Sequence, residues 1–327
     1  MAARVHAFLG FVLTAFLALA IETPAAKAQG YPTAPVKIIV QVGAGSAIDV
    51  LARMIGERLT QMWGQQVIII NHAGAGGAIA ARAAATASPD GYTLFLAASS
   101  AFVLLPEIQA NLPFDVHRDL LPLTFVSEQP FVFAGSASLG VTTLPEFIAL
   151  AKKRPGALHY AASTRGSLPH LTVEALRERA GIDITFVPYS GSASALNDVV
   201  GGQIALIVDG FSGLSGSIAG GSLRALAVAS PQRLPNFPNL PTVAETIPGF
   251  SASGWLVMVA PTGTPEAVTQ KIRQDLKSVL AQPDLQKRFE DLGTYPRAMN
   301  STELAAFIQE ERRSWKQVLD RVGIKPQ

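Results

Sequence analysis

Short apolar runs alternate with alanine-rich stretches of helical periodicity through the first third of the chain. The pattern predicts strands at 36–40, 67–70 and 93–96, with helices at 50–62 and 78–87 between them. These strands are continuously apolar instead of alternating, which is typical of parallel strands covered by helices on both faces. The order of the elements therefore predicts an α/β fold.

A second unit of the same kind follows. Its predicted strands and helices are, in chain order, 157–162, 170–179, 183–187, 193–200, 204–208 and 223–229. Two such units in a chain of 327 residues predict two lobes that share a cleft. We expect the chain to cross between them near 131–133 and again near 253–255. Lobe one then contains 29–132 and 254–327, and lobe two contains 133–253.

Several helix starts can be located from capping signals. Thr143 with Glu146, and Asn300 with Glu303, have the spacing of a capping box, and Pro265 precedes a third helix. The helices that begin near Pro265 and Asn300 lie in the C-terminal part of the chain, and we expect them to complete lobe one.

The N-terminal segment has the pattern of a secretory signal. Arg4 precedes an apolar run at 7–20, and the small residues Ala26 and Ala28 have the spacing that signal peptidase reads. The run is shorter than the roughly 20 residues that cross a bilayer. We therefore expect residues 1–28 to be a cleavable signal peptide and the mature protein to be periplasmic.

Charge and cysteine content exclude several classes of function. The chain has 26 basic and 24 acidic side chains, and the basic ones are scattered, so no nucleic-acid partner is expected. The absence of cysteine excludes a disulfide framework and thiolate chemistry. We expect a monomer.

Glycine-rich loops follow three of the predicted strands, at 43–49, 71–77 and 163–167. Ligands of open α/β sheets bind beyond the carboxyl ends of strands, and N–H groups at a helix start favour negative charge. Each loop alone is more simply a tight turn. Together they predict one anion-binding site that faces the cleft.

The same loops do not support a cofactor or catalytic chemistry. Gly43 and Gly45 begin like a dinucleotide fingerprint, but Ile48 stands where the third glycine belongs, and no P-loop is present. No two histidines have metal-ligand spacing. The stretch around Ser215 resembles a nucleophile elbow, but Ser217 stands where the last glycine of that motif belongs. We expect no cofactor, no metal and no enzymatic activity.

Ordered sequence blocks across nearly the whole mature chain resemble the Bug or TctC-like family, the extracytoplasmic binding proteins of tripartite tricarboxylate transporters. The most distinctive block is Pro89–Leu94, and further matches include 45–49, 74–77, 187–189, 223–228 and 240–242. The resemblance implies a two-lobed, type II Venus-flytrap fold with two hinge crossings. It also implies closure around a small carboxylate, without a cofactor, and delivery to the membrane permease subunits.

The resemblance also implies where the ligand binds, because family members hold the carboxylate mainly through main-chain amides. The expected ligand-binding residues are those that match the family's loops by position, together with residues that follow strands ending at the cleft. They are Gly45, Ser46, Ala47, Asp49, Ser99, Ser163, Thr164, Gly166, Ser167, His170 and Asp209. Asp49 stands at a helix start, where capping amides is a simpler role. His170 is expected first to bond its own loop. Asp209 would repel a carboxylate but could accept from a ligand amine or hydroxyl.

The chain departs from the family pattern at the pocket walls. Gln41, Val42 and Gly43 replace a Pro-Phe-type segment, and Ser46 replaces the second glycine of its loop. The hypothesis for Ser46 is that its hydroxyl donates to the carboxylate. Two other functions stay open: a periplasmic sensor that presents its closed form to a receptor, and a serine hydrolase that uses Ser167 with His170.

Overall fold

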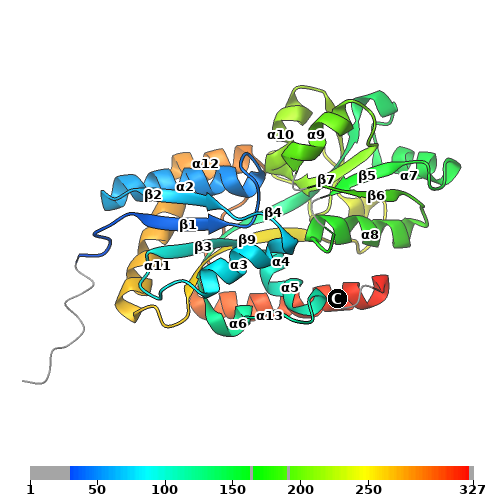
Figure 1. Cartoon of the computed structure of the whole chain (residues 1–327). Helices are drawn as coiled ribbons and strands as arrows, with labels where there is room; N and C mark the ends of the chain where they lie inside the picture. Colours follow the sequence, from blue (N-terminus) through cyan, green and yellow to red (C-terminus); the bar gives the residue numbers. More distant parts are fainter. Residues whose placement is uncertain (1–29, 163–164, 190–191, 324–327) are drawn as a thin grey trace, which may run out of the picture.

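Two mixed sheets that share one long strand form the framework of the structure (Figure 1). The computed structural model describes residues 30–162, 165–189 and 192–323. The strand order is β2-β1-β3-β9-β4-β7-β5-β6, and β8 pairs with β4. The strands are β1 (Val36–Val40), β2 (Val67–Asn71), β3 (Thr93–Ala98), β4 (Leu120–Ser136), β5 (His159–Ala162), β6 (Thr185–Pro188), β7 (Leu206–Gly210), β8 (Leu223–Val228) and β9 (Ser253–Pro261).

Parallel pairing within each lobe follows the predicted alternation of strands and helices. Strands β2 and β3 pair parallel to β1, and β6 and β7 pair parallel to β5. The helices of the first lobe are α2 (Ala47–Trp63), α3 (Ala78–Ala85), α4 (Ser99–Val103), α5 (Leu105–Ile108), α6 (Val116–Asp119), α11 (Glu266–Leu280) and α12 (Pro283–Asp291). Those of the second are α7 (Leu144–Lys153), α8 (Leu168–Ala180), α9 (Ser192–Val200) and α10 (Phe211–Ala219).

The predicted helix starts are confirmed. Thr143 and Asn300 form capping boxes at the starts of α7 and α13 (Ser301–Val322), and Pro265 is the N-cap of α11. Short 3₁₀ turns lie at Ala75–Gly77, Ala137–Leu139 and Val243–Glu245. Among the described residues, no helix is both long and apolar enough to span a membrane.

Strand β4 crosses from one sheet to the other. Its residues from Leu120 to Pro130 pair antiparallel with β9, and those from Phe131 onward pair with β7 and β8. The sequence did not predict so long a strand, because Pro122 and Pro130 interrupt its pattern. The register of β4 shifts directly after Pro122. Proline has no N–H to donate, so the shift lies where the regular hydrogen-bond pattern between the strands is already interrupted. The lobe boundaries at residues 132 and 254 stay a prediction.

The C-terminal helix α13 packs against elements on both sides of this crossing. It contacts α4 and the strand β4, and also α8 of the second unit. The indole of Trp255 in β9 donates to the Glu311 carboxylate of α13 at 3.0 Å. One apolar core, which includes Phe125, Phe133 and Trp255, is continuous through this region, so α13 braces the crossing.

Gly254→Ala is expected to destabilise the crossing. A Cβ on Gly254 would lie 2.9 Å from the ring of Phe131, so the ring or the strand has to move. Overpacking of this kind costs about 1–3 kcal/mol of the free energy of unfolding, which urea denaturation measures. The control is Gly216→Ala inside α10, where nothing lies within 4 Å. There the change should be neutral or stabilising, and equal losses in both variants would contradict the packing argument.

Candidate ligand-binding site

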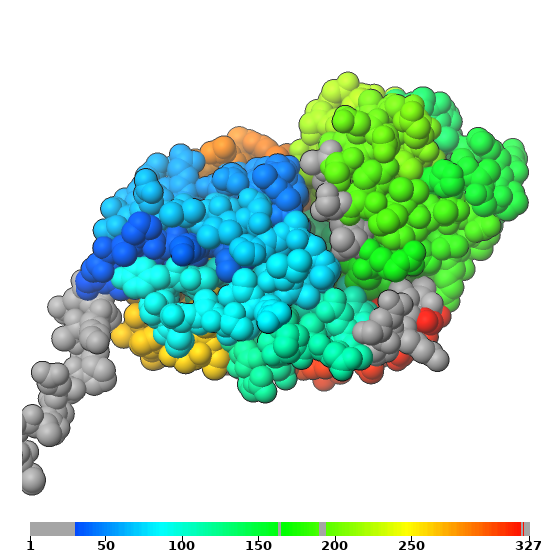
Figure 2. Space-filling view, in the orientation of Figure 1, coloured from blue at the N-terminus to red at the C-terminus, as the bar shows by residue number. Residues whose placement is uncertain are grey.

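A pocket lies where the carboxyl ends of β1, β3 and β7 meet the starts of α2 and α8. It encloses about 770 Å³, including its open mouth. The surface of the α2 and α3 segment faces that of the α8 and α9 segment along this boundary (Figure 2). The lining residues from the first lobe include Gln41, Val42, Ser46–Ile48 and Ala98–Ser100, and those from the crossing strands and the second lobe include Gln129, Phe131, Gly254, Ser167–Pro169 and Asp209.

The structure brings part of the predicted set together in this pocket. Ser46, Ala47, Ser99, Ser167 and Asp209 line it. The other described members of the set are not among its lining residues: Gly45, Asp49, Gly166 and His170. Ser163 and Thr164 lie outside the described residues. That all of these residues serve a ligand stays a prediction.

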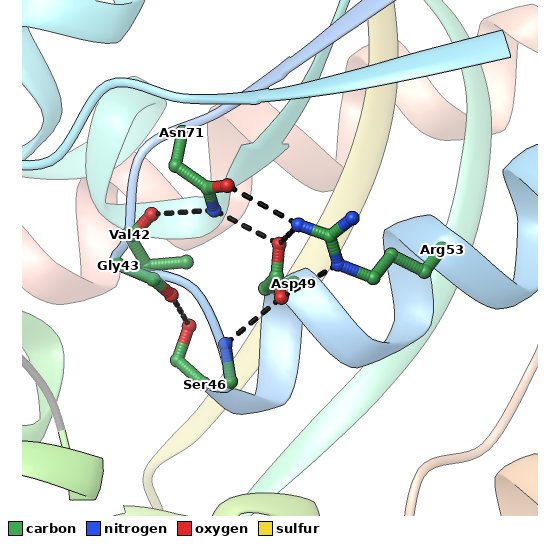
Figure 3. A network of polar contacts seen from close by, with 7 residues as sticks. Val42, Gly43, Ser46, Asp49, Arg53 and Asn71 are labelled. Atoms are coloured by element: carbon green, nitrogen blue, oxygen red, sulfur yellow. Dashed lines mark hydrogen bonds and ion pairs between the residues drawn. The ribbon is translucent and has the colours of Figure 1, made fainter.

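Asp49 organises the loop that leads into α2 (Figure 3). Its carboxylate accepts from the Gly45 N–H, from Arg53 Nε and from Asn71 Nδ2, each at 2.9 Å. Burial alone would raise the pKa of Asp49, but these hydrogen bonds and the Arg53 charge hold it below its usual value. Asp49 thus accepts from one amide, but that amide precedes the helix and α2 has no side-chain cap; the carboxylate is neutralised within its own lobe.

The same loop leaves the start of α2 uncapped. Gly45 has φ +79, and its N–H is taken by Asp49. The Ser46 hydroxyl donates to the Gly43 carbonyl at 2.6 Å and makes no capping hydrogen bond. The hypothesis for Ser46 was that its hydroxyl donates to a ligand carboxylate, whereas here the acceptor is the Gly43 carbonyl. The first-turn N–H groups of Ala47 and Ile48 have no acceptor within a helix, and both residues line the pocket.

At the second lobe, Ser167 and His170 hold the start of α8. The Ser167 hydroxyl accepts from the His170 N–H at 3.3 Å, and His170 Nδ1 accepts from the Gly166 N–H at 3.2 Å. The expectation that His170 bonds its own loop is confirmed. Its Nε2 lies 3.8 Å from Glu174 Oε1. Both ring nitrogens thus face groups other than the Ser167 hydroxyl, which argues against a Ser167–His170 hydrolase.

Gln41 fixes the junction between the first strand and α4. Its amide donates to Ser100 Oγ at 2.9 Å and accepts from the Ala98 N–H at 3.1 Å. A Cβ on Gly77 would lie 2.8 Å from this amide, so glycine is required there. The sequence signalled Gln41 only as a departure from the family pattern, and did not reveal this role.

The pocket offers neutral donors and a single charged side chain. Among the described residues that line it, Asp209 is the only charged one, and its Oδ1 accepts from the Gly210 N–H at 2.7 Å. Within the described part of the chain, no cluster of three acidic or histidine side chains could hold a metal ion. The arrangement is suited to hold a small anion by amides and hydroxyls.

Comparisons with known proteins place this site in a family. A family model described as the tripartite tricarboxylate transporter family receptor matches residues 51–324. The chain belongs to this family. Its members are periplasmic solute-binding proteins and not enzymes, so the resemblance, the two-lobed α/β fold and the non-enzymatic class are confirmed.

Individual relatives cover almost the whole chain. The protein BugT of Bordetella pertussis is 34% identical over 316 residues, which cover 96% of this chain and 97% of BugT. The solved structure of R. palustris Rpa4515 with adipate has a TM-score of 0.88 at 30% identity, and covers 91% of this chain and 100% of that one. MatC from Rhodopseudomonas palustris, with bound malate, has a TM-score of 0.81 at 29% identity, and the match covers 88% of this chain and 100% of MatC.

His170 is expected to make stability depend on pH. Burial lowers the pKa of His170 from 6.5 to about 4, although the Glu174 charge opposes this shift. Because the unfolded chain binds the proton more readily, the contribution of the neutral imidazole is complete above pH 6.5 and is lost as the pH falls towards 4. The loss in the free energy of unfolding is about 2–3 kcal/mol.

The matched variant is His170→Asn, whose side-chain oxygen can accept from the Gly166 N–H without titrating. Urea unfolding between pH 7.5 and 4 should show a shallower decline for this variant than for the wild type. Parallel curves for the two proteins would mean that His170 is not the titrating group.

Proposed function

We propose that this chain captures a small carboxylate between its lobes in the periplasm and presents it to the membrane permease of a tripartite tricarboxylate transporter. In this proposal residues 1–28 are its signal peptide. The observation that carries the proposal is the uncapped start of α2 inside the pocket. A helix start of this kind attracts an anion through free N–H groups and the helix dipole.

The local charges support the same assignment. The carboxylate nearest the α2 amides, that of Asp49, is already paired with Arg53 and Asn71. It therefore does not compete for the amides at Ala47 and Ile48. None of the described lining residues is a cation, so neutral donors meet the charge of a ligand there, which favours small carboxylates over phosphates that attract arginine.

Ligands of the relatives supply the class to test first. Rpa4515 was solved with adipate and MatC with malate, and both are dicarboxylates. Closure is the working step in this proposal: Gly166 of the second lobe already lies against Ile108 of α5, since a Cβ on Gly166 would approach the Ile108 side chain to 2.7 Å. Ligand held between the two lobes stabilises the closed form.

A panel of short mono- and dicarboxylates, including adipate and malate, is expected to contain at least one that raises the melting temperature. Binding to the folded state alone stabilises it by about 2.7 kcal/mol at a concentration of 100 times Kd. Differential scanning fluorimetry detects this shift, and calorimetric titration gives Kd. The proposal would be rejected if no carboxylate of the panel, and neither sulfate nor phosphate, raised the melting temperature.

Ala47→Pro tests the helix start directly. Proline is tolerated at the first helical position, and Ser46 already has the extended conformation that precedes proline, with φ −75 and ψ 164. The variant removes one N–H from the site, and Kd should rise about 10- to 100-fold.

The matched control is Ser301→Pro, at the first position of α13. The residue before it, Asn300, has nearly the same conformation, with φ −77 and ψ 170. This variant should keep the wild-type Kd. Equal affinity of Ala47→Pro and wild type would show that the α2 amide does not hold the ligand.

A further inference from the structure

Gln129 is a buried side chain in the pocket whose amide donor has no acceptor. It is 6% exposed, and its Nε2 makes no hydrogen bond within the described structure. A few other buried donors in the described residues share this property, among them Ser127 and Ser212, but Gln129 is the one that lines the pocket. A buried amide left without a partner costs about 1–3 kcal/mol, so its retention calls for an explanation.

The position of Gln129 in the fold points to that explanation. It is the penultimate residue of β4 before the strand changes sheets, and it pairs with Gly254 of the returning strand β9. A Cβ built on Gly210 would lie 3.9 Å from the Gln129 amide and 3.9 Å from the Ala47 methyl. The amide therefore reaches the gap between the start of α2 and the start of α10.

Both of these helix starts lack a side-chain cap. Ser46 does not cap α2, and Gly210 cannot cap α10 because it has no side chain. A side-chain donor between two uncapped helix starts adds to the positive potential that the N–H groups of those starts create. Polar side chains of the lining have other partners: Gln41 donates to Ser100, Ser99 accepts from the Trp255 N–H, and Asp209 accepts from the Gly210 N–H.

We propose that the Gln129 amide is a specificity-determining donor, which binds an oxygen of the carboxylate that the α2 amides hold. This inference rests on the proposed function. Because Gln129 lies on the crossing strand, between the two lobes, it contacts the ligand where a hinge motion moves the walls least. The ligand then supplies the acceptor that the folded chain lacks, and the cost of the unpaired donor favours the occupied state.

Gln129→Met tests this with little change in shape, since methionine has a similar length and no donor. With the tightest ligand from the carboxylate panel, Kd should rise about 10- to 100-fold. The ligand-free protein should melt at the same temperature or higher, because an unsatisfied buried donor has been removed. A purely structural role predicts the reverse: a lower melting temperature with Kd unchanged, and that result would overturn the inference.

Two further variants sharpen the test. Gln129→Glu replaces the donor by an acceptor of the same shape, so carboxylate binding should fall further than in Gln129→Met. Ser127→Ala removes an unpartnered buried hydroxyl from the same strand outside the pocket lining, and should leave Kd unchanged. If Ser127→Ala weakens binding as much as Gln129→Met, the effect belongs to the strand and the inference fails.

The outcome also separates this inference from the proposed function. A wild-type protein that binds no member of the panel rejects both. A wild-type protein that binds a carboxylate, with an equal Kd in Gln129→Met, keeps the proposed function and rejects only the role of Gln129.

Discussion

Strand β4 pairs with β9 in one sheet up to Pro130 and with β7 and β8 in the other from Phe131 onward. Backbone hydrogen bonds of one continuous strand thus connect the two lobes. The pocket depends on this constraint, because the crossing places the carboxyl ends of β1 and β3 opposite the start of α8. Glycine at position 254 lets the ring of Phe131 pack closely against the returning strand, and α13 braces both sides. Two sheets joined by one paired strand are restricted to a small set of relative positions.

The chemistry of the site follows from where hydrogen bonds have already been satisfied. Asp49 is tied to Arg53, Asn71 and the Gly45 N–H, and the Ser46 hydroxyl is tied to Gly43. These contacts shape the loop and also remove its side chains from competition for the first amides of α2. What remains for a ligand is main-chain N–H, which recognises negative charge at a helix start and adapts poorly to cations.

In the proposed function, discrimination among anions falls to side chains that project into the pocket from other elements. Gln41 is held in place by its hydrogen bonds to Ser100 and Ala98, so it shapes the wall of the pocket. Gln129 has no such partner for its Nε2. A neutral amide at the crossing can orient a carboxylate without the desolvation cost of a buried cation. The same fold can serve different carboxylates when these few wall residues change.

Local patterns in the sequence determined the elements and the class of this protein. Apolar runs at 36–40 and 67–70, the capping boxes at Thr143 and Asn300, and the loop at 43–49 depend on neighbouring residues, so they can be read along the chain. The family blocks added the two-lobed fold. The tertiary structure decided which donors are free, because that depends on partners far apart in sequence: Asn71 for Asp49, Gly210 and Ala47 beside Gln129, and Trp255 for Ser99. Hydrogen bonds between distant residues form only after the strands pair, and for this reason the sequence predicted the loop but not the unpartnered donor of Gln129.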